Sequence, residues 1–383
     1  MRRPPRPRLG LRDLHPVRLG PLRMTAAPKR QLELLPDRTA PGLPVLDQRE
    51  RGTSFVRLRV RTVLNSPAST GMGFWSVNPY VGCEFGCTYC YARDTHRYTL
   101  ERLGQRSDTP AWLDFERRIL VKTEVADVLA RTLDPARLGR DTLVIGTATD
   151  PYQPAERRFR LTRAILQRLL GYRGLSIGII TKSPLVTRDL DLLQELSTRH
   201  EVSVNISLAT LDARLARRLE LRSPVPRARI RALRCLTKGG VHAGLLIAPI
   251  VPGLTDDRAG LSRLMGAAKE AGARYVVGSA LRLGPSARRR FLPVLAREFP
   301  ELAGRYEKHY AASEGASIEY QAALKRRLHE LQQAHGFSLE EGRRRRRQLE
   351  EGGEPGATVA AENQPALSLP LVTLTPSGSE GEG

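Results

Sequence analysis

The sequence predicts an α/β protein built on a parallel sheet that is wound into an open or partial barrel. Short apolar runs rich in Val, Ile and Leu alternate along the chain with longer stretches of helical periodicity. Each predicted strand is a continuous apolar run, which is typical of strands covered by helices. Six strand–helix units follow one another, and such units are joined by right-handed crossovers. Because six units are too few for a closed eight-unit barrel, we expect the open form.

The strands are expected at residues 75–81, 142–148, 175–181, 202–209, 243–250 and 274–280. The helices between them are expected at residues 123–133, 156–170, 184–196, 228–238 and 256–271, and three more at 285–298, 301–312 and 317–335. Gly171, Gly239 and Gly272 stand at expected helix ends, and Pro184 and Pro285 near helix starts. In such folds the chemistry lies at the C-terminal ends of the strands, so the residues that follow each strand are the candidates for a site.

The chain is expected to divide into four parts. Residues 70–300 would form the partial barrel, and residues 301–340 a C-terminal helical extension. Residues 1–50 are rich in Arg and Pro and are expected to be a disordered leader, with Met24 as an alternative start. Residues 341–383 hold an arginine run and then a Gly, Glu, Pro and Ser tail, which also predicts disorder.

The charge balance favours an anionic partner. The chain has 62 basic and 40 acidic residues, a formal net charge of +22. Such an excess attracts polyanions such as nucleic acid, although arginines that only solvate the outer helices would give the same count. No run of about 18 apolar residues predicts a membrane span, and the N-terminus has no apolar segment typical of a secretory signal. We therefore expect a cytoplasmic protein without a membrane partner.

The four cysteines are distributed as in a metal site rather than a disulfide scaffold. Cys83, Cys87 and Cys90 fall within eight residues, in the spacing C-x3-C-x2-C after the first strand. Three thiolates on one loop can hold three irons of a [4Fe–4S] cluster, which leaves the fourth iron open for the amino and carboxylate groups of S-adenosylmethionine. The alternative is a zinc ion completed by His96, which would suit a nucleic-acid-binding protein without catalysis. Cys235, inside a predicted helix, is expected to be a core residue.

Several segments resemble the radical S-adenosylmethionine superfamily, and within it the spore photoproduct lyase-like group. They are NPYVGCEFGCTYCYAR, GTATDPYQPAE, TKSPLVTRDLDLL, SLATLD, residues 220–224 and APIVPGLTD. The resemblance implies a partial (β/α)6 TIM-type barrel and reductive cleavage of S-adenosylmethionine at a [4Fe–4S] cluster. The resulting 5′-deoxyadenosyl radical abstracts hydrogen from a substrate that the sequence does not identify. The charge favours a nucleic acid, and a peptide or a small metabolite are the alternatives. The resemblance also implies a reducing partner such as flavodoxin or ferredoxin.

The resemblance assigns roles to individual residues. Tyr89 and Tyr91 match aromatic positions beside the cofactor, and Tyr91 is a catalytic candidate. Further cofactor-binding positions are expected at the strand ends: Thr149, Lys182 and Ser207. Glu220, in the loop after strand four, is expected to reach the cofactor or, equally, to form a solvated pair with Arg222 at the helix end.

One departure from the lyase pattern concerns the second strand. The lyase uses a cysteine there to donate hydrogen to the product radical, whereas residues 146–150 contain none, so the thymine-dimer reaction is not expected here. In the loop that follows, Asp150 and Gln153 are further catalytic candidates. Their position before a helix equally predicts a capping role, and the two roles are compatible. An enzyme remnant that keeps the cluster without turnover is a third alternative.

Overall fold

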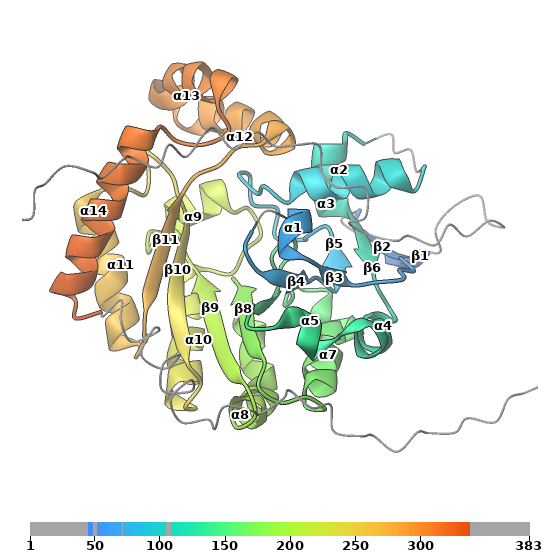
Figure 1. The fold of residues 1–383 in the computed structure, drawn as a ribbon. Coiled ribbons are helices and arrows are strands. Elements are labelled where there is room, and N and C mark those ends of the chain that lie inside the picture. The colour runs from blue at the N-terminus through green and yellow to red at the C-terminus, as the bar shows by residue number, and fades with distance from the viewer. Residues whose placement is uncertain (1–44, 49–51, 71, 105–108, 338–383) are drawn as a thin grey trace, which may run out of the picture.

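The computed structural model describes residues 45–48, 52–70, 72–104 and 109–337, and its main feature is an open sheet of seven strands (Figure 1). In order across the sheet these are β11 (Val276–Ala280), β10 (Ala243–Ile250), β9 (Glu201–Ser207), β8 (Ser176–Thr181), β7 (Leu143–Ile145), β4 (Trp75–Val77) and β3 (Leu64–Asn65). The six strands from β4 to β11 pair in parallel, and β3 pairs antiparallel with β4 at one edge. The predicted partial barrel of six parallel strands is confirmed.

The helices lie around this sheet, some against its strands and others beyond its edges or strand ends. In the first half they are α1 (Pro67–Thr70), α2 (Arg93–Arg102), α3 (Ala111–Arg117), α4 (Val125–Thr132), α5 (Pro135–Leu138), α6 (Glu156–Phe159), α7 (Leu161–Leu169), the 3₁₀ helix η1 (Pro184–Asp189) and α8 (Leu190–Ser197). In the second half they are α9 (Ala213–Leu219), α10 (Pro226–Lys238), α11 (Arg258–Glu270), α12 (Pro285–Glu298), α13 (Pro300–Ala312) and α14 (Ile318–Ala334). Figure 1 shows α11 and α14 together at the β11 edge, and α2 and α3 beyond the opposite edge.

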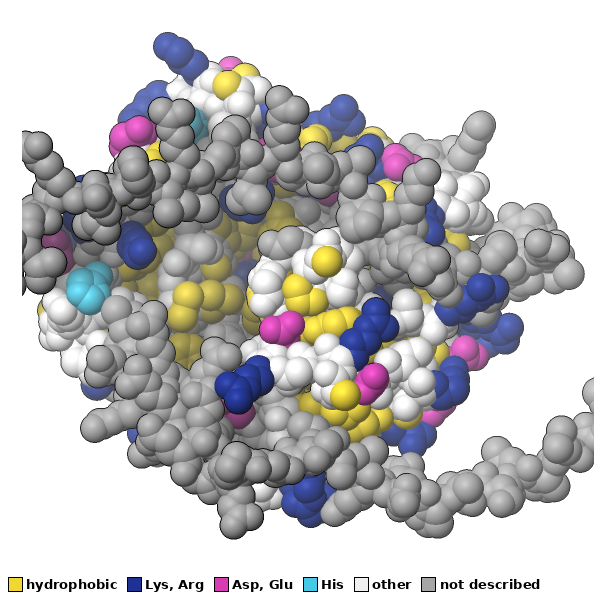
Figure 2. All heavy atoms as spheres, viewed as in Figure 1, with side chains coloured by type: hydrophobic (Ala, Val, Ile, Leu, Met, Phe, Trp, Pro, Cys, Tyr) yellow, Lys and Arg dark blue, Asp and Glu magenta, His cyan; other side chains and the backbone are white. Residues whose placement is uncertain are grey.

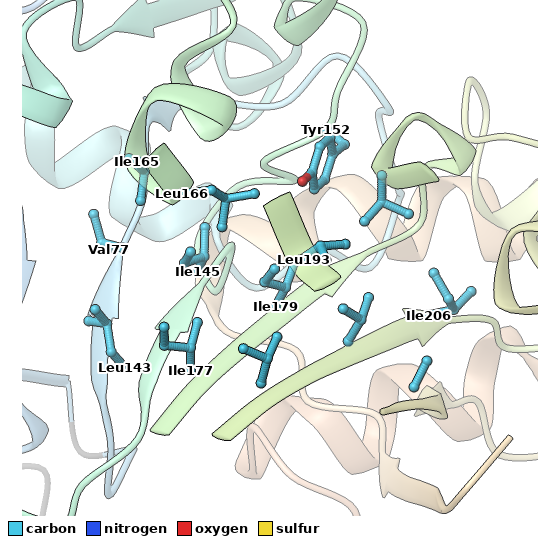
Figure 3. Close-up of a cluster of buried hydrophobic side chains, with 14 of the residues drawn as sticks. Val77, Leu143, Ile145, Tyr152, Ile165, Leu166, Ile177, Ile179, Leu193 and Ile206 are labelled. Atoms are coloured by element: carbon cyan, nitrogen blue, oxygen red, sulfur yellow. The ribbon is translucent and has the colours of Figure 1, made fainter. Parts of the chain in front are cut away.

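The core forms where alternate strand residues meet these helices. Figure 3 shows Ile145, Ile177, Ile179 and Ile206 from three neighbouring strands directed to the same side, where Leu166 of α7 packs. All five side chains have no exposed surface. Burial of each such side chain contributes about 1.5–3 kcal/mol, so this layer fixes the register of the parallel strands.

The opposite, concave face of the sheet is more polar and more open. The intervening residues of β9, Ser203 and Asn205, face this side, and the Tyr275 hydroxyl donates to Asn205 Oδ1 at 3.1 Å. At the β11 edge Val277 is 48% exposed. Figure 2 shows hydrophobic side chains in a hollow over β10 and β11. This face therefore leaves room for a ligand beneath the C-terminal strand ends.

Several predicted elements differ in detail. The helix expected at residues 156–170 is divided into α6 and α7 by Arg160, whose φ is 51°. The helix expected at 184–196 begins as the 3₁₀ helix η1, and the first strand ends at Val77 rather than residue 81. The predicted leader and the tail from residue 341 lie outside the described residues, except Val45–Gln48, which form a strand.

A second, four-stranded sheet was not predicted. Its order is β1 (Val45–Gln48), β2 (Ser54–Arg57), β6 (Arg118–Val121) and β5 (Tyr80–Val81). Strands of two to four residues are too short for a periodicity to be recognised. This sheet matters for the site because β5 leads directly into the cysteine loop. Among the described helices, none is long and apolar enough to cross a membrane.

The turn after β7 gives a test of this architecture. Gly146 has a φ of 93°, and a Cβ atom there would lie 2.4 Å from Pro151 Cδ and 2.7 Å from the Ile180 carbonyl oxygen. We expect Gly146→Ala to lower the free energy of unfolding by about 3 kcal/mol, because strain and a clash act together. Gly240, with φ of 79° and no neighbour within 4 Å, is the control, and Gly240→Ala should cost about 1 kcal/mol. Urea unfolding measures both, and equal losses would contradict the packing at Gly146.

Candidate active site

The cysteine loop leaves β5 and ends at the start of α2. Cys83 and Cys87 are 7% exposed and Cys90 is half-buried, and none of the three is in a disulfide. Gly82 and Gly86 have φ of 93° and 64°, which favours glycine. A Cβ atom on Gly86 would lie 2.8 Å from both Glu116 Oε2 and Arg222 Nη2. The glycines thus let the loop turn and let a charged group approach its backbone.

Backbone contacts tie this loop to the segment after α9. The Thr88 N–H and hydroxyl both donate to the Leu219 carbonyl at 2.9 Å, and the Arg222 N–H donates to the Phe85 carbonyl at 3.0 Å. Cys87 forms an isolated antiparallel bridge with Glu220. Two segments more than 130 residues apart in sequence therefore hold each other in place.

A buried charge network stabilises the loop from one side. The Glu116 carboxylate, 2% exposed, accepts from Arg93 at 2.6 Å, from Arg222 at 2.9 Å and from Arg290 at 3.0 Å. Burial tends to raise the pKa of Glu116, but the three guanidinium groups outweigh it and lower the pKa below its usual value. Arg93 also donates to the Cys87 carbonyl at 2.6 Å, and Arg222 to the Glu84 carbonyl at 2.5 Å.

Four of the predicted cofactor-binding residues come together beside Cys87. The Lys182 ammonium donates to Ser207 Oγ at 2.7 Å and lies 3.6 Å from Glu220 Oε1. The Tyr89 hydroxyl donates to the same Glu220 oxygen, and the Lys182 Nζ lies 6.0 Å from the Tyr89 ring centroid. Lys182 follows β8, Ser207 ends β9 and Glu220 follows α9, so residues from two neighbouring strand ends lie together beside the cysteine loop.

Arg229, which the sequence did not single out, completes this group. Its guanidinium is 1% exposed and donates to Glu220 Oε2, to the Ser207 carbonyl and to the Pro224 carbonyl. Burial would raise the pKa of Glu220, but Arg229 and Lys182 lower it to about 2. Burial beside this carboxylate also raises the pKa of the Tyr89 phenol, so Tyr89 stays a hydrogen-bond donor.

Tyr91 and Thr149 connect the loop to the end of β7. The Tyr91 hydroxyl donates to the Thr147 carbonyl, and its side chain is 46% exposed. The Thr149 hydroxyl donates to the Gly82 carbonyl at 2.6 Å. Tyr91 therefore presents an accessible aromatic ring beside the cysteines, whereas the Thr149 hydroxyl is used inside the protein.

Asp150 and Gln153 both make hydrogen bonds inside the protein. Asp150 accepts from the Thr181 hydroxyl at 2.7 Å, from the Lys182 N–H at 2.7 Å and from the Tyr152 N–H at 2.9 Å. Gln153, with no exposed surface, accepts from the Glu84 N–H at 2.9 Å and donates to Thr149 at 3.0 Å and to the Gly82 carbonyl at 3.2 Å. These contacts let both side chains position the loops around the site, and their catalytic roles stay predictions.

The donor set fits an iron–sulfur cluster better than a zinc ion. Among the described residues, no three Cys, His, Asp or Glu side chains converge as a single metal ion would require. A cluster instead takes each thiolate on a different iron. His96, the expected fourth zinc ligand, is buried and pairs through Nε2 with the Arg118 carbonyl at 2.9 Å, and its pKa is lowered by burial to about 4. The zinc alternative therefore has no support.

The thiols need a cationic partner to ionise. Burial raises the pKa values of Cys83 and Cys90, and that of Cys87 to about 12. Metal binding replaces these protons, because thiolates are the ligands that iron takes. Cys235 lies exposed on α10 rather than in the core, so it does not extend the site.

Comparisons with known proteins relate this chain to the radical SAM superfamily. The model of the radical SAM superfamily matches residues 77–264, which run from the end of β4 into α11. Uncharacterized protein Rv2578c of Mycobacterium tuberculosis (strain ATCC 25618 / H37Rv) is 36% identical over 279 residues, which cover 72% of this chain and 79% of that protein. Uncharacterized protein MJ0683 of Methanocaldococcus jannaschii is 28% identical over 203 residues, which cover 53% of this chain and 70% of that protein.

Solved structures of spore photoproduct lyase share the fold. The lyase complexed with dinucleoside spore photoproduct gives a TM-score of 0.53 at 16% identity, over 77% of this chain and 85% of that chain. A lyase mutant with bound AdoMet and dinucleoside spore photoproduct gives a TM-score of 0.52 with the same identity and coverage. At this level of identity the likeness concerns the arrangement of strands and helices.

The positioning role of Gln153 can be tested by iron retention. Gln153→Ala removes three buried hydrogen bonds, each worth about 1 kcal/mol, and leaves the Gly82 and Glu84 backbone groups without that partner. We expect about 2–4 kcal/mol lower stability and less iron bound per chain after reconstitution. The control Gln333→Ala, at an exposed position of α14, should change stability by less than about 0.5 kcal/mol. Full iron content in Gln153→Ala would contradict the positioning role.

The buried Glu220 carboxylate predicts a pH dependence of stability. Its pKa of about 2, against about 4.3 in the unfolded chain, corresponds to about 3 kcal/mol of stabilisation. Because the folded pKa is the lower one, this contribution is complete above about pH 5 and is lost as the pH falls from about 4 towards 2. Glu220→Gln should therefore destabilise the protein at pH 7, and the difference from wild type should shrink below pH 4. Urea unfolding at several pH values measures this, with the exposed Glu195→Gln as control.

Proposed function

The chain belongs to the radical SAM superfamily and is an enzyme of that kind, and from this premise we propose that Cys83, Cys87 and Cys90 hold a [4Fe–4S] cluster. The observation that carries the proposal is the arrangement around these thiols. Three free cysteines lie on one glycine-containing loop, and Tyr89, Lys182, Ser207 and Glu220 gather beside it at the strand ends. Three thiolates ligate three irons of a cubane and leave one iron for a substrate ligand.

When bound and reduced, the cluster supplies the electron that cleaves S-adenosylmethionine to methionine and a 5′-deoxyadenosyl radical. The chain's own residues bind and orient the reactants. The Lys182 ammonium, half-buried between Ser207 and Glu220, is suited to bind the methionyl carboxylate. The exposed ring of Tyr91 is suited to stack on a flat ligand group next to Cys90.

Burial contributes the protection that a radical needs. Cys83, Cys87 and Tyr89 are each less than a tenth exposed, and Phe85 between the first two cysteines is 3% exposed. Water and oxygen are thereby kept from two of the three ligands, and electrostatic interactions in the site are strengthened by the low local dielectric. Because the cluster must be reduced to cleave S-adenosylmethionine, the proposed function also supports a reducing, cytoplasmic location.

The substrate that best suits the chain is a nucleic acid or a fragment of one. The support is the net charge of +22 and the likeness in fold to a lyase whose solved complex holds a dinucleoside. The chain departs from the lyase at the end of β7, where Gly146 to Asp150 include no cysteine. We therefore propose hydrogen abstraction from a nucleic acid component without the thymine-dimer repair that the lyase carries out.

The cysteine variants test this function directly. Anaerobic reconstitution with iron and sulfide should give a brown protein with a reducible [4Fe–4S] signal, and dithionite with S-adenosylmethionine should release 5′-deoxyadenosine. Cys83→Ala, Cys87→Ala and Cys90→Ala should each abolish the release, whereas Cys235→Ala, outside the loop, should leave it unchanged.

Adding DNA or RNA oligonucleotides then tests the substrate class. A nucleic acid substrate should accelerate 5′-deoxyadenosine release, and a product of altered mass should appear. A wild-type protein that takes up zinc in place of the cluster and releases no 5′-deoxyadenosine would overturn the proposed function.

A further inference from the structure

An open pocket of about 660 Å³ lies directly behind the cysteine loop. Its walls come from the loop itself and from the segments that follow β7, β8 and α9. Four arginines line it, namely Arg157, Arg158, Arg217 and Arg222, and no Asp or Glu does. We call it the arginine pocket.

Two of these arginines are uncompensated. Arg157 and Arg217 are exposed, and the ion pairs among the described residues join neither of them to a carboxylate. Arg222 is different, because it pairs with Glu116, a carboxylate that it shares with Arg93 and Arg290. The surface of the pocket therefore carries a positive charge that attracts an anionic partner.

Apolar residues also line the pocket. They are Phe85, Pro154, Pro184, Leu185, Pro224 and Val225, and Val225 is 45% exposed. Apolar surface flanked by charged side chains is typical of the surfaces on which protein partners dock.

The pocket also reaches the cluster ligands. Ser223 lines it, and the Ser223 hydroxyl lies 3.5 Å from Cys87 Sγ. Phe85, which also lines the pocket, lies between Cys83 and Cys87 in the sequence of the loop. A partner seated in the pocket is thus separated from Cys87 by a single side chain, and electron-transfer rates fall exponentially with such separation.

We propose that the arginine pocket is the docking surface for an acidic one-electron carrier of the flavodoxin class, which reduces the cluster through Ser223 and Cys87. This inference rests on the proposed function, because only a redox-active cluster needs such a partner. The carrier's reduced flavin gives up one electron and the cluster gains one, and no bond is made or broken. The apolar edge of a flavin suits the apolar lining residues, and an acidic carrier surface suits Arg157 and Arg217. Redox encounters of this kind bury little surface and are steered by charge.

Charge reversal at the two exposed arginines of the pocket, Arg157 and Arg217, tests the inference. The double variant Arg157→Glu/Arg217→Glu is compared with the control Arg263→Glu/Arg326→Glu, which makes the same change of net charge at exposed positions of α11 and α14. The first readout is binding of oxidised flavodoxin by isothermal titration calorimetry at low salt. The second is 5′-deoxyadenosine release, driven either by dithionite or by flavodoxin with its NADPH-dependent reductase.

We expect the pocket variant to bind flavodoxin about tenfold more weakly and to show a KM for flavodoxin raised about tenfold, with the dithionite-driven rate within twofold of wild type. The control should match wild type in every assay. Equal flavodoxin binding and KM in the two variants would overturn the inference. A pocket variant whose dithionite-driven rate falls as much as its flavodoxin-driven rate would overturn it too.

Two more outcomes would also overturn it. In the first, only the rate driven by a ferredoxin depends on Arg157 and Arg217. In the second, the pocket variant loses binding of a labelled oligonucleotide while its KM for flavodoxin is unchanged, which would assign the pocket to nucleic acid. Failure of the wild-type enzyme to release 5′-deoxyadenosine with dithionite would contradict the proposed function instead, so the two failures are distinguishable.

Discussion

The buried carboxylate of Glu116 is the interaction on which the site depends. Phe85 and Tyr89 anchor the cysteine loop in an apolar cluster with Phe115 and Leu219, and polar contacts to the loop backbone fix its shape further. Arg93 and Arg222 supply these contacts at the Cys87 and Glu84 carbonyls, and Glu116 binds both guanidinium groups. Removing one partner of a buried ion pair costs about 3–5 kcal/mol, since the other charge is left unpaired. A single carboxylate therefore holds α2, α3 and the segment after α9 around the loop.

The parallel sheet supplies the second half of the site. Lys182 follows β8 and Ser207 ends β9, and parallel neighbours bring their C-terminal ends to one edge. Glu220 joins this edge to the loop, because its backbone pairs with Cys87 while its side chain binds Arg229 and lies 3.6 Å from Lys182. The apolar layer on the convex face fixes the register, so a shift of one residue would turn Ser207 away from Lys182.

The sequence predicted what depends on local pattern. The six parallel strands follow from apolar runs, and the cysteine loop follows from its spacing together with its resemblance to a family. The four-stranded sheet was missed because β5 and β6 are short and pair only through the tertiary fold. Glu116 and Arg229 were missed because a charged side chain in an arginine-rich chain carries no sign of its burial. Asp150 and Gln153 were placed on the right loop, but only the structure shows that their polar atoms face the protein.

The cysteine loop meets different residues on its two sides, and this separation has a functional consequence. Tyr89 meets Glu220 and Lys182, in the group that suits a polar ligand, whereas Phe85 and Ser223 meet the arginine pocket. An electron arriving through the pocket therefore does not have to cross the space that the ligand occupies. Cys87 belongs to both sides, since its backbone pairs with Glu220 and its sulfur contacts Ser223. In the proposed arrangement the concave face of the barrel is left to the ligand and substrate, and a protein partner docks outside it without opening the site to water.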